Sequence, residues 1–261
     1  MKQLQIFILT LIIGFNTSNA IAQISENPID VLSEKLLQNE LLTNRFLKNF
    51  VFVKTNTFKK KALADMDKSI ALFDDNLSYI ILHLPYDRKV KEDFLKLQNF
   101  WNIYRINITD FEKDNYESLV KKTYRLGKYI KQLNKDIFNK HPDYSKNKKS
   151  IEIAQLNASN GKKIDAIAAI YVLKKAFHIK DAASYFDIDM GSMKKNLKKT
   201  GKLKTLNPKA KNLITDLKTT LESIKTLLDK EKYNPKMMYA YDNVYTNKTF
   251  KLLKFIIQTI K

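Results

Sequence analysis

Apolar residues recur every three or four positions through almost the whole chain after residue 27, which is the spacing that places them on one face of an α-helix. Residues that start or stop helices bound these stripes: Thr57 and Asp87 as N-caps, Pro85 as a stop, and the Asn-Pro pairs 207–208 and 234–235. Only five glycines and five prolines occur in 261 residues, which favours long helices and short loops. The predicted helices cover residues 28–53, 58–84, 88–111, 113–140, 151–177, 181–201, 208–228 and 235–256. The sequence therefore predicts an all-α protein.

The eight predicted helices fall into two halves of similar order. A proline precedes the third helix of each half, and an asparagine interrupts the apolar stripe of each first helix. Four helices with short loops form an up-down bundle. We therefore expect an elongated chain of two tandem four-helix modules, residues 28–141 and 146–261. The stripe of the third helix is the most regular and predicts that Trp101 and Tyr104 are core residues.

Polar residues interrupt two of the apolar stripes. The fifth helix carries Asn157, Asn160 and Gly161, and the first carries Asn39 and Thr43. Buried amides need hydrogen-bond partners, and a glycine in mid-helix costs about 1 kcal/mol relative to alanine. These residues indicate either a close helix crossing or a place where a polar ligand is held.

Residues 1–22 have the pattern of a signal peptide. Lys2 precedes an apolar run at residues 4–15, and Ala20-Ile21-Ala22 offers a cleavage site. We expect cleavage after Ala22 and export to the periplasm. No later stretch is apolar for long enough to cross a bilayer, so we expect no transmembrane segment after cleavage. The chain has no cysteine, which excludes disulfides.

The chain is strongly basic, with a formal net charge of +20. Only four of its 47 basic residues are arginines, the residue type best suited to reading bases. We therefore expect no sequence-specific nucleic-acid partner and interpret most lysines as solvated surface. The densest run is free of acidic residues and forms the candidate patch of an alternative, polyanion-binding function. Its members are Lys194, Lys195, Lys198, Lys199, Lys202, Lys204, Lys209 and Lys211.

The sequence shows no pattern typical of an enzyme. His83, His141 and His178 are far apart and lack the spacing of zinc ligands. There is no cysteine nucleophile, no glycine-rich phosphate loop and no nucleophile elbow around a serine. We expect no catalytic residues, no metal and no cofactor.

Several segments resemble the PilJ-type sensor domain, the periplasmic helical module of type IV pili methyl-accepting chemotaxis transducers. Leu42-Thr43-Asn44-Arg45 is similar to the Leu-Ser-Gln-Arg part of that family's first-helix motif. Residues 69–74 resemble its second helix, Leu97 with Trp101 its third, and residues 157–159 the corresponding place in the second half. The glycine and basic residues that precede the family motif are missing from the first helix, where the equivalent positions hold Leu37, Gln38 and Glu40.

The resemblance implies a free-standing sensor-like module that binds a small anionic or polar ligand. It would signal through a membrane sensor or another envelope protein, and a homodimer is one assembly that the sequence allows. The candidate ligand-binding residues are Asn39, Thr43, Arg45, Asn157, Asn160, Lys162 and Lys163. Two alternatives stay open. The amides can instead form a buried polar layer that fixes helix register, and the protein can be a cationic envelope-binding protein or a structural adaptor of a pilus or envelope complex.

Overall fold

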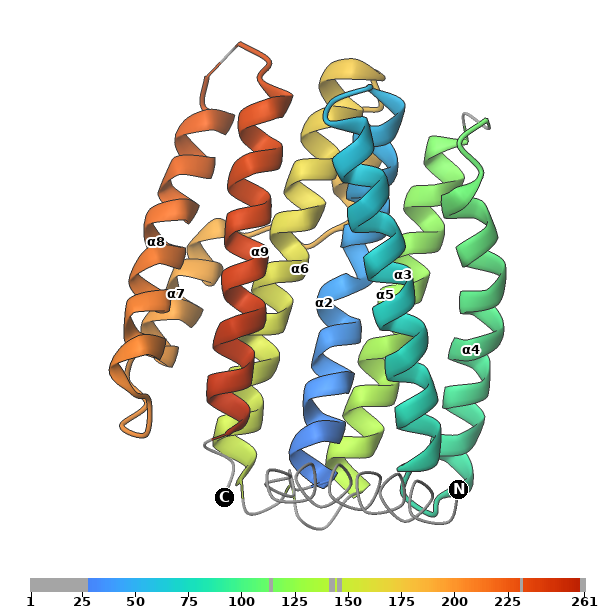
Figure 1. Ribbon diagram of the computed structural model, residues 1–261, viewed down its shortest axis with the longest axis vertical. Coiled ribbons are helices and arrows are strands. Elements are labelled where there is room, and N and C mark those ends of the chain that lie inside the picture. Colours follow the sequence, from blue (N-terminus) through green and yellow to red (C-terminus); the bar gives the residue numbers. More distant parts are fainter. Residues whose placement is uncertain (1–27, 113–114, 141–143, 145–146, 231, 259–261) are drawn as a thin grey trace, which may run out of the picture.

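The computed structural model describes residues 28–112, 115–140, 144, 147–230 and 232–258, and the predicted signal peptide lies outside them. The described residues form α-helices and no strands, which confirms the all-α prediction. The helices lie side by side with short connections between them (Figure 1). None of the described helices is both long enough and apolar enough to cross a membrane. Their bounds are α2 (Pro28–Lys54), α3 (Lys59–Leu82), α4 (Arg88–Thr109), α5 (Tyr116–Lys140), α6 (Lys148–Ala176), the 3-10 helix η2 (Asp181–Tyr185), α7 (Met190–Thr200), α8 (Pro208–Leu228) and α9 (Pro235–Ile257).

Capping side chains set several helix starts as the sequence indicated. Asp87, Asn207 and Asn234 each accept a hydrogen bond from the backbone amide three residues later, at 2.9–3.1 Å. The predicted N-cap at Thr57 was wrong, because α3 begins at Lys59 and its N-cap position is Phe58. There Phe58 has a left-handed backbone with φ 52° and gives no side-chain cap.

The predicted helix over residues 181–201 was also wrong in part. This segment is a 3-10 turn followed by an extended stretch and the short helix α7. Asp189 caps α7 by accepting a hydrogen bond from the amide of Gly191 at 2.8 Å. A capping aspartate inside an apolar pattern therefore divides the segment.

Helix α2 lies at the centre of the molecule (Figure 1). It packs most extensively against α3 and α6, and also against α5, α9 and α4. Every residue of α2 from Asn39 to Val53 is buried, so the helix is covered on all of its faces. Helices α3–α5 of the first half and α6 and α9 of the second half thus share one central helix. That the two halves are tandem repeats stays a prediction.

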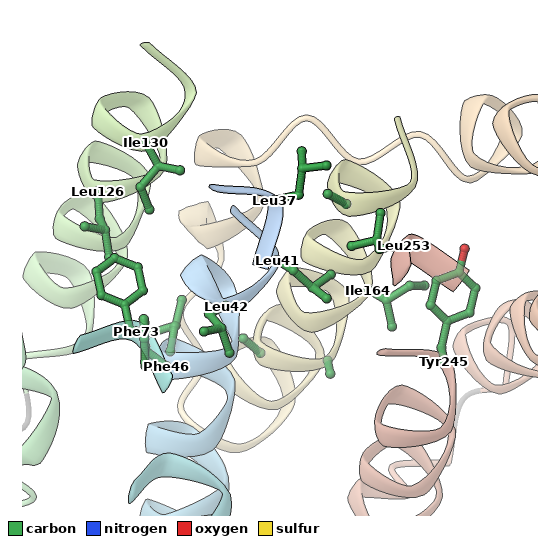
Figure 2. Packing of buried hydrophobic residues seen from close by; sticks show 14 of the residues in the cluster. Leu37, Leu41, Leu42, Phe46, Phe73, Leu126, Ile130, Ile164, Tyr245 and Leu253 are labelled. Carbon is green, nitrogen blue, oxygen red and sulfur yellow. The ribbon is translucent and has the colours of Figure 1, made fainter. Parts of the chain in front are cut away.

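The core is built outward from the apolar side chains of α2 (Figure 2). Leu42 and Phe46 point toward Phe73, Leu126 and Ile130 of the first half, whereas Leu37 and Leu41 lie toward the second half, where α6 and α9 contribute Ile164, Tyr245 and Leu253. Trp101 and Tyr104 are 1% and 0% exposed, which confirms both as core residues.

Gly161 of α6 lies against side chains of both α2 and α9. A Cβ atom at this position would collide with Cδ1 of Leu41 and lie 3.1 Å from Cγ2 of Thr249. Both neighbours are buried and have little room to move. The glycine in mid-helix is therefore explained by a close helix crossing.

We expect Gly161→Ala to lower the free energy of unfolding by about 1–3 kcal/mol, because overpacking outweighs the gain in helix propensity. Urea denaturation of the purified protein measures this change. Gly201→Ala is the matched control, since a Cβ there meets its nearest neighbours at ordinary distances of 3.6 and 3.7 Å. A Gly161→Ala protein as stable as the control would show that the crossing has free space.

Candidate functional site

A cleft of about 730 Å³ lies between α5 and α6, with α2 beneath it. Helix α5 supplies one wall and α6 the other, and Glu40 of α2 lies between them. The connection between the two helices adds Tyr144, and α7 adds Lys199. The complete lining is Glu40, Lys131, Asn134, Lys135, Phe138, Asn139, Tyr144, Lys148, Ile151, Glu152, Gln155, Leu156, Ser159, Lys162 and Lys199.

A buried polar contact forms one part of the cleft wall. The Nζ atom of Lys162 lies 3.3 Å from Oε1 of Glu40, and the side-chain amide of Asn134 donates to Oε2 of the same carboxylate at 3.3 Å. The side chains of Glu40 and Lys162 are 9% and 17% exposed. This pairing fixes the α2, α5 and α6 sides of the cleft relative to one another.

The rest of the lining combines apolar surface with cations. Phe138, Ile151 and Leu156 contribute apolar side chains. Five lysines and two glutamates line the cleft, so it carries three more positive charges than negative ones. Of these five lysines, only Lys162 forms an ion pair with a carboxylate of the described residues. The cleft is therefore suited to a molecule with both an apolar body and a negative charge.

The polar pair predicted on the first helix contacts α3 and α5. Asn39 accepts a hydrogen bond from Asn76 at 2.9 Å, and the Thr43 hydroxyl donates to the Asn39 carbonyl at 3.1 Å. The Thr43 methyl group lies against Gly127 of α5. Both residues are buried away from the cleft lining.

The asparagines predicted on α6 hold the short helix α7. Asn157 donates to Oγ1 of Thr200 at 2.7 Å. Asn160 donates to the Met193 carbonyl at 3.2 Å and accepts from Asn196 at 3.0 Å. These amides dock one helix onto another in the interior.

The predicted cations are dispersed as well. Arg45 donates to Asn247 of α9 at 3.2 Å, and Lys163 lies 3.2 Å from Asp187 in the segment before α7. Lys162 lines the cleft. Of the seven predicted ligand-binding residues, Lys162 is in that lining and the other six are outside it.

The lysines of the candidate polyanion patch are all exposed. Four lie on α7, two follow it, and two are in the first turn of α8. Lys194 forms an ion pair with Glu222 of α8 at 2.7 Å, and Lys199 reaches the α5–α6 cleft. The patch therefore overlaps the rim of the cleft.

The structure also contains a buried charge cluster that the sequence analysis missed. Nζ of Lys48 lies 3.1 Å from Oδ1 of Asp165, 2.6 Å from Oδ2 of Asp242 and 3.0 Å from Oδ1 of Asn243. The side chains of Lys48 and both aspartates are 0% exposed. The ring of Tyr239 covers the amine, with its centroid 5.5 Å from Nζ.

One ammonium group cannot neutralise two carboxylates, so the cluster binds a proton. Burial raises the pKa of Asp242, the neighbouring Asp165 carboxylate adds to this shift, and Lys48 opposes both effects, so that the resulting pKa is about 8. The cluster is thus neutral when Lys48 is charged and one of the two aspartates is protonated. In the described part of the chain, no group of acidic or histidine side chains is arranged to hold a metal ion.

A sequence signal for this cluster was present. Residues 41–53, Leu-Leu-Thr-Asn-Arg-Phe-Leu-Lys-Asn-Phe-Val-Phe-Val, place apolar side chains on every face of a helix. A helix of that kind is buried on all sides, so a lysine within it has to be buried and paired.

No family model, no curated protein and no solved structure matches this chain.

Proposed function

We propose that this protein is a ligand-binding helical module whose ligand, a small amphipathic anion, occupies the cleft between α5 and α6. The observation that carries the proposal is the cleft lining. It joins apolar side chains to lysines that have no carboxylate partner in the described structure. Unpaired ammonium groups around a partly apolar hollow favour an anion with an apolar body.

The size of the cleft supports the same class of ligand. Pockets for small molecules have volumes of roughly 300–1,000 Å³ and combine apolar walls with a few polar groups that fix orientation. The cleft has about 730 Å³, with Phe138 and Ile151 on opposite walls. A single medium-chain carboxylate or aromatic acid fits these dimensions.

The position of the cleft also suggests how binding would be transmitted. One wall is the last helix of the first predicted module, and the other wall is the first helix of the second. A ligand that contacts both walls stabilises one relative position of α5 and α6 over others. This is the behaviour expected of a sensor-like module acting through a partner protein, as the resemblance to PilJ-type domains implies.

We expect decanoate to displace the fluorescent anion anilinonaphthalene sulfonate from the purified protein, and decanol to displace it much less. The double variant Lys131→Glu/Lys148→Glu should weaken decanoate binding by at least about tenfold, because two cations become anions. Fluorescence titration gives both dissociation constants.

Lys225→Glu/Lys230→Glu is the matched control, since both lysines are exposed and outside the cleft lining, Lys225 in the last turn of α8 and Lys230 just after it. Equal affinity for decanoate in the cleft variant and the control would reject the cleft as the site. Binding of decanol as tight as that of decanoate would reject an anionic ligand.

A further inference from the structure

The amine of Lys48 lies against a carboxamide as well as two carboxyl groups. Its 3.0 Å contact is with Oδ1 of Asn243, and Asp165 and Asp242 lie within 3.1 Å of the same nitrogen. Asn243 is 7% exposed and Lys48 is 0% exposed. Lys48 belongs to α2, Asp165 to α6, and Asp242 and Asn243 to α9, so three helices far apart in sequence meet at one nitrogen atom.

We propose that Lys48 and Asn243 become joined by an intramolecular isopeptide bond. The Lys48 ammonium group first gives a proton to the carboxylate of Asp165. The Nζ lone pair then attacks Cγ of Asn243, Nζ loses a second proton, and the bond from Cγ to Nδ2 breaks as Nδ2 takes that proton. The products are an amide between the two side chains, a protonated Asp165 and one molecule of ammonia.

The surroundings supply what this reaction needs. A carboxylate in contact with the amine can accept its proton, which produces the neutral nucleophile. Burial favours that transfer, because it replaces a separated pair of charges by two neutral groups. The cluster starts neutral, with one ammonium, one carboxylate and one carboxylic acid, and it ends neutral, with two carboxylic acids. No charge is left in the interior at the end.

Exclusion of water keeps the reaction directed at the amide. The Tyr239 ring covers the amine on one side, and its hydroxyl donates to Asp65 of α3 at 2.7 Å. A second cation, Lys61 of α3, lies 5.7 Å from the centroid of the same ring. The Lys48 side chain is 0% exposed, so solvent does not reach it, and the carboxyl groups of Asp165 and Asp242 are the competing electrophiles among its described contacts.

Such a bond would be a covalent cross-link in a chain that cannot form disulfides. The protein contains no cysteine, so it has no disulfide. A bond between residues 48 and 243 would tie the central helix α2 to the last helix α9 and enclose most of the chain. A cross-link across a long loop restricts the unfolded chain strongly.

The test is the mass of the purified full chain and of its peptides. We expect the folded wild-type protein to lose the mass of one ammonia, about 17 Da, and to yield a branched tryptic peptide that contains both residues. Trypsin should not cut after the modified Lys48. Lys48→Arg and Asn243→Ala should have their unmodified masses, whereas the control Lys162→Arg should keep the loss.

Three results would overturn the proposal. The first is a wild-type protein at its unmodified mass after prolonged incubation in the folded state. The second is a loss of about 17 Da without a peptide joining residues 48 and 243, as a cyclised asparagine would give. The third is a loss of one water, about 18 Da, that persists in Asn243→Ala and so assigns the bond to Asp242. The wild-type measurements stand even where a variant fails to fold.

Discussion

Lys48→Met is expected to lower the free energy of unfolding by about 3–5 kcal/mol, the usual effect of removing one partner from a buried ion pair. Methionine fills a similar volume, so lost packing contributes little. What remains is a pair of aspartates, Asp165 and Asp242, at 0% exposure without a cation. They must both take up protons or bury a negative charge. Urea denaturation followed by circular dichroism measures the change. If mass analysis shows a Lys48–Asn243 bond, every protein compared carries Asn243→Ala, so that no covalent link enters the comparison.

Two further proteins isolate the electrostatic cause. Lys225→Met removes an exposed lysine of α8 and should change stability by less than about 0.5 kcal/mol. The triple variant Lys48→Met/Asp165→Asn/Asp242→Asn removes every charge of the cluster and should regain most of the lost stability. A single variant as stable as the Lys225→Met control would contradict the cluster as a structural element. Failure of the triple variant to recover would assign the loss to packing.

The helices were predictable from the sequence because their signals are local. Apolar spacing, Asn-Pro starts and a capping aspartate act within a few residues, and they located seven of the eight predicted segments as single helices. The segment over residues 181–201 failed because its apolar spacing continues across the turn that Asp189 ends. Local periodicity does not report where the chain changes direction.

The position of α2 was harder to predict because it depends on contacts between distant parts of the chain. The spacing of apolar residues indicates one buried face and one solvated face for each helix. In this fold both halves of the chain cover α2, so its second face is buried as well. Lys48 was therefore grouped with the many lysines interpreted as surface, although it is 0% exposed.

The candidate ligand-binding residues show the same limit. Asn39, Thr43, Asn157 and Asn160 are buried on inner helix faces, as their spacing indicated. The three asparagines form side-chain hydrogen bonds with neighbouring helices, and Thr43 donates to the Asn39 carbonyl of its own helix. The cleft lysines are divided among α5, α6 and α7. Only the packing of these helices brings them together.

The buried cluster also predicts how stability depends on pH. The folded protein raises the pKa of Asp242 from 3.8 to about 8, chiefly through burial, with the Asp165 carboxylate adding to the shift. Below about pH 4 the folded and unfolded chains both hold this proton, and the stabilisation is fully present. Between about pH 4 and 8 only the folded chain holds it, so stability falls as pH rises, by at most about 1.4 kcal/mol per pH unit. Above pH 8 the contribution is lost.

Asp242→Asn should remove this dependence, because an amide resembles the protonated carboxyl in shape and does not titrate. We expect the stability of the wild-type protein to fall more steeply than that of the variant between pH 5 and 8, and the two curves to become parallel above that range. Urea denaturation across this range gives both curves, and subtraction cancels the titration of the other groups. If mass analysis shows a Lys48–Asn243 bond, both proteins carry Asn243→Ala, so that no covalent link enters the comparison. Parallel curves throughout would show that Asp242 does not hold the proton in the folded protein.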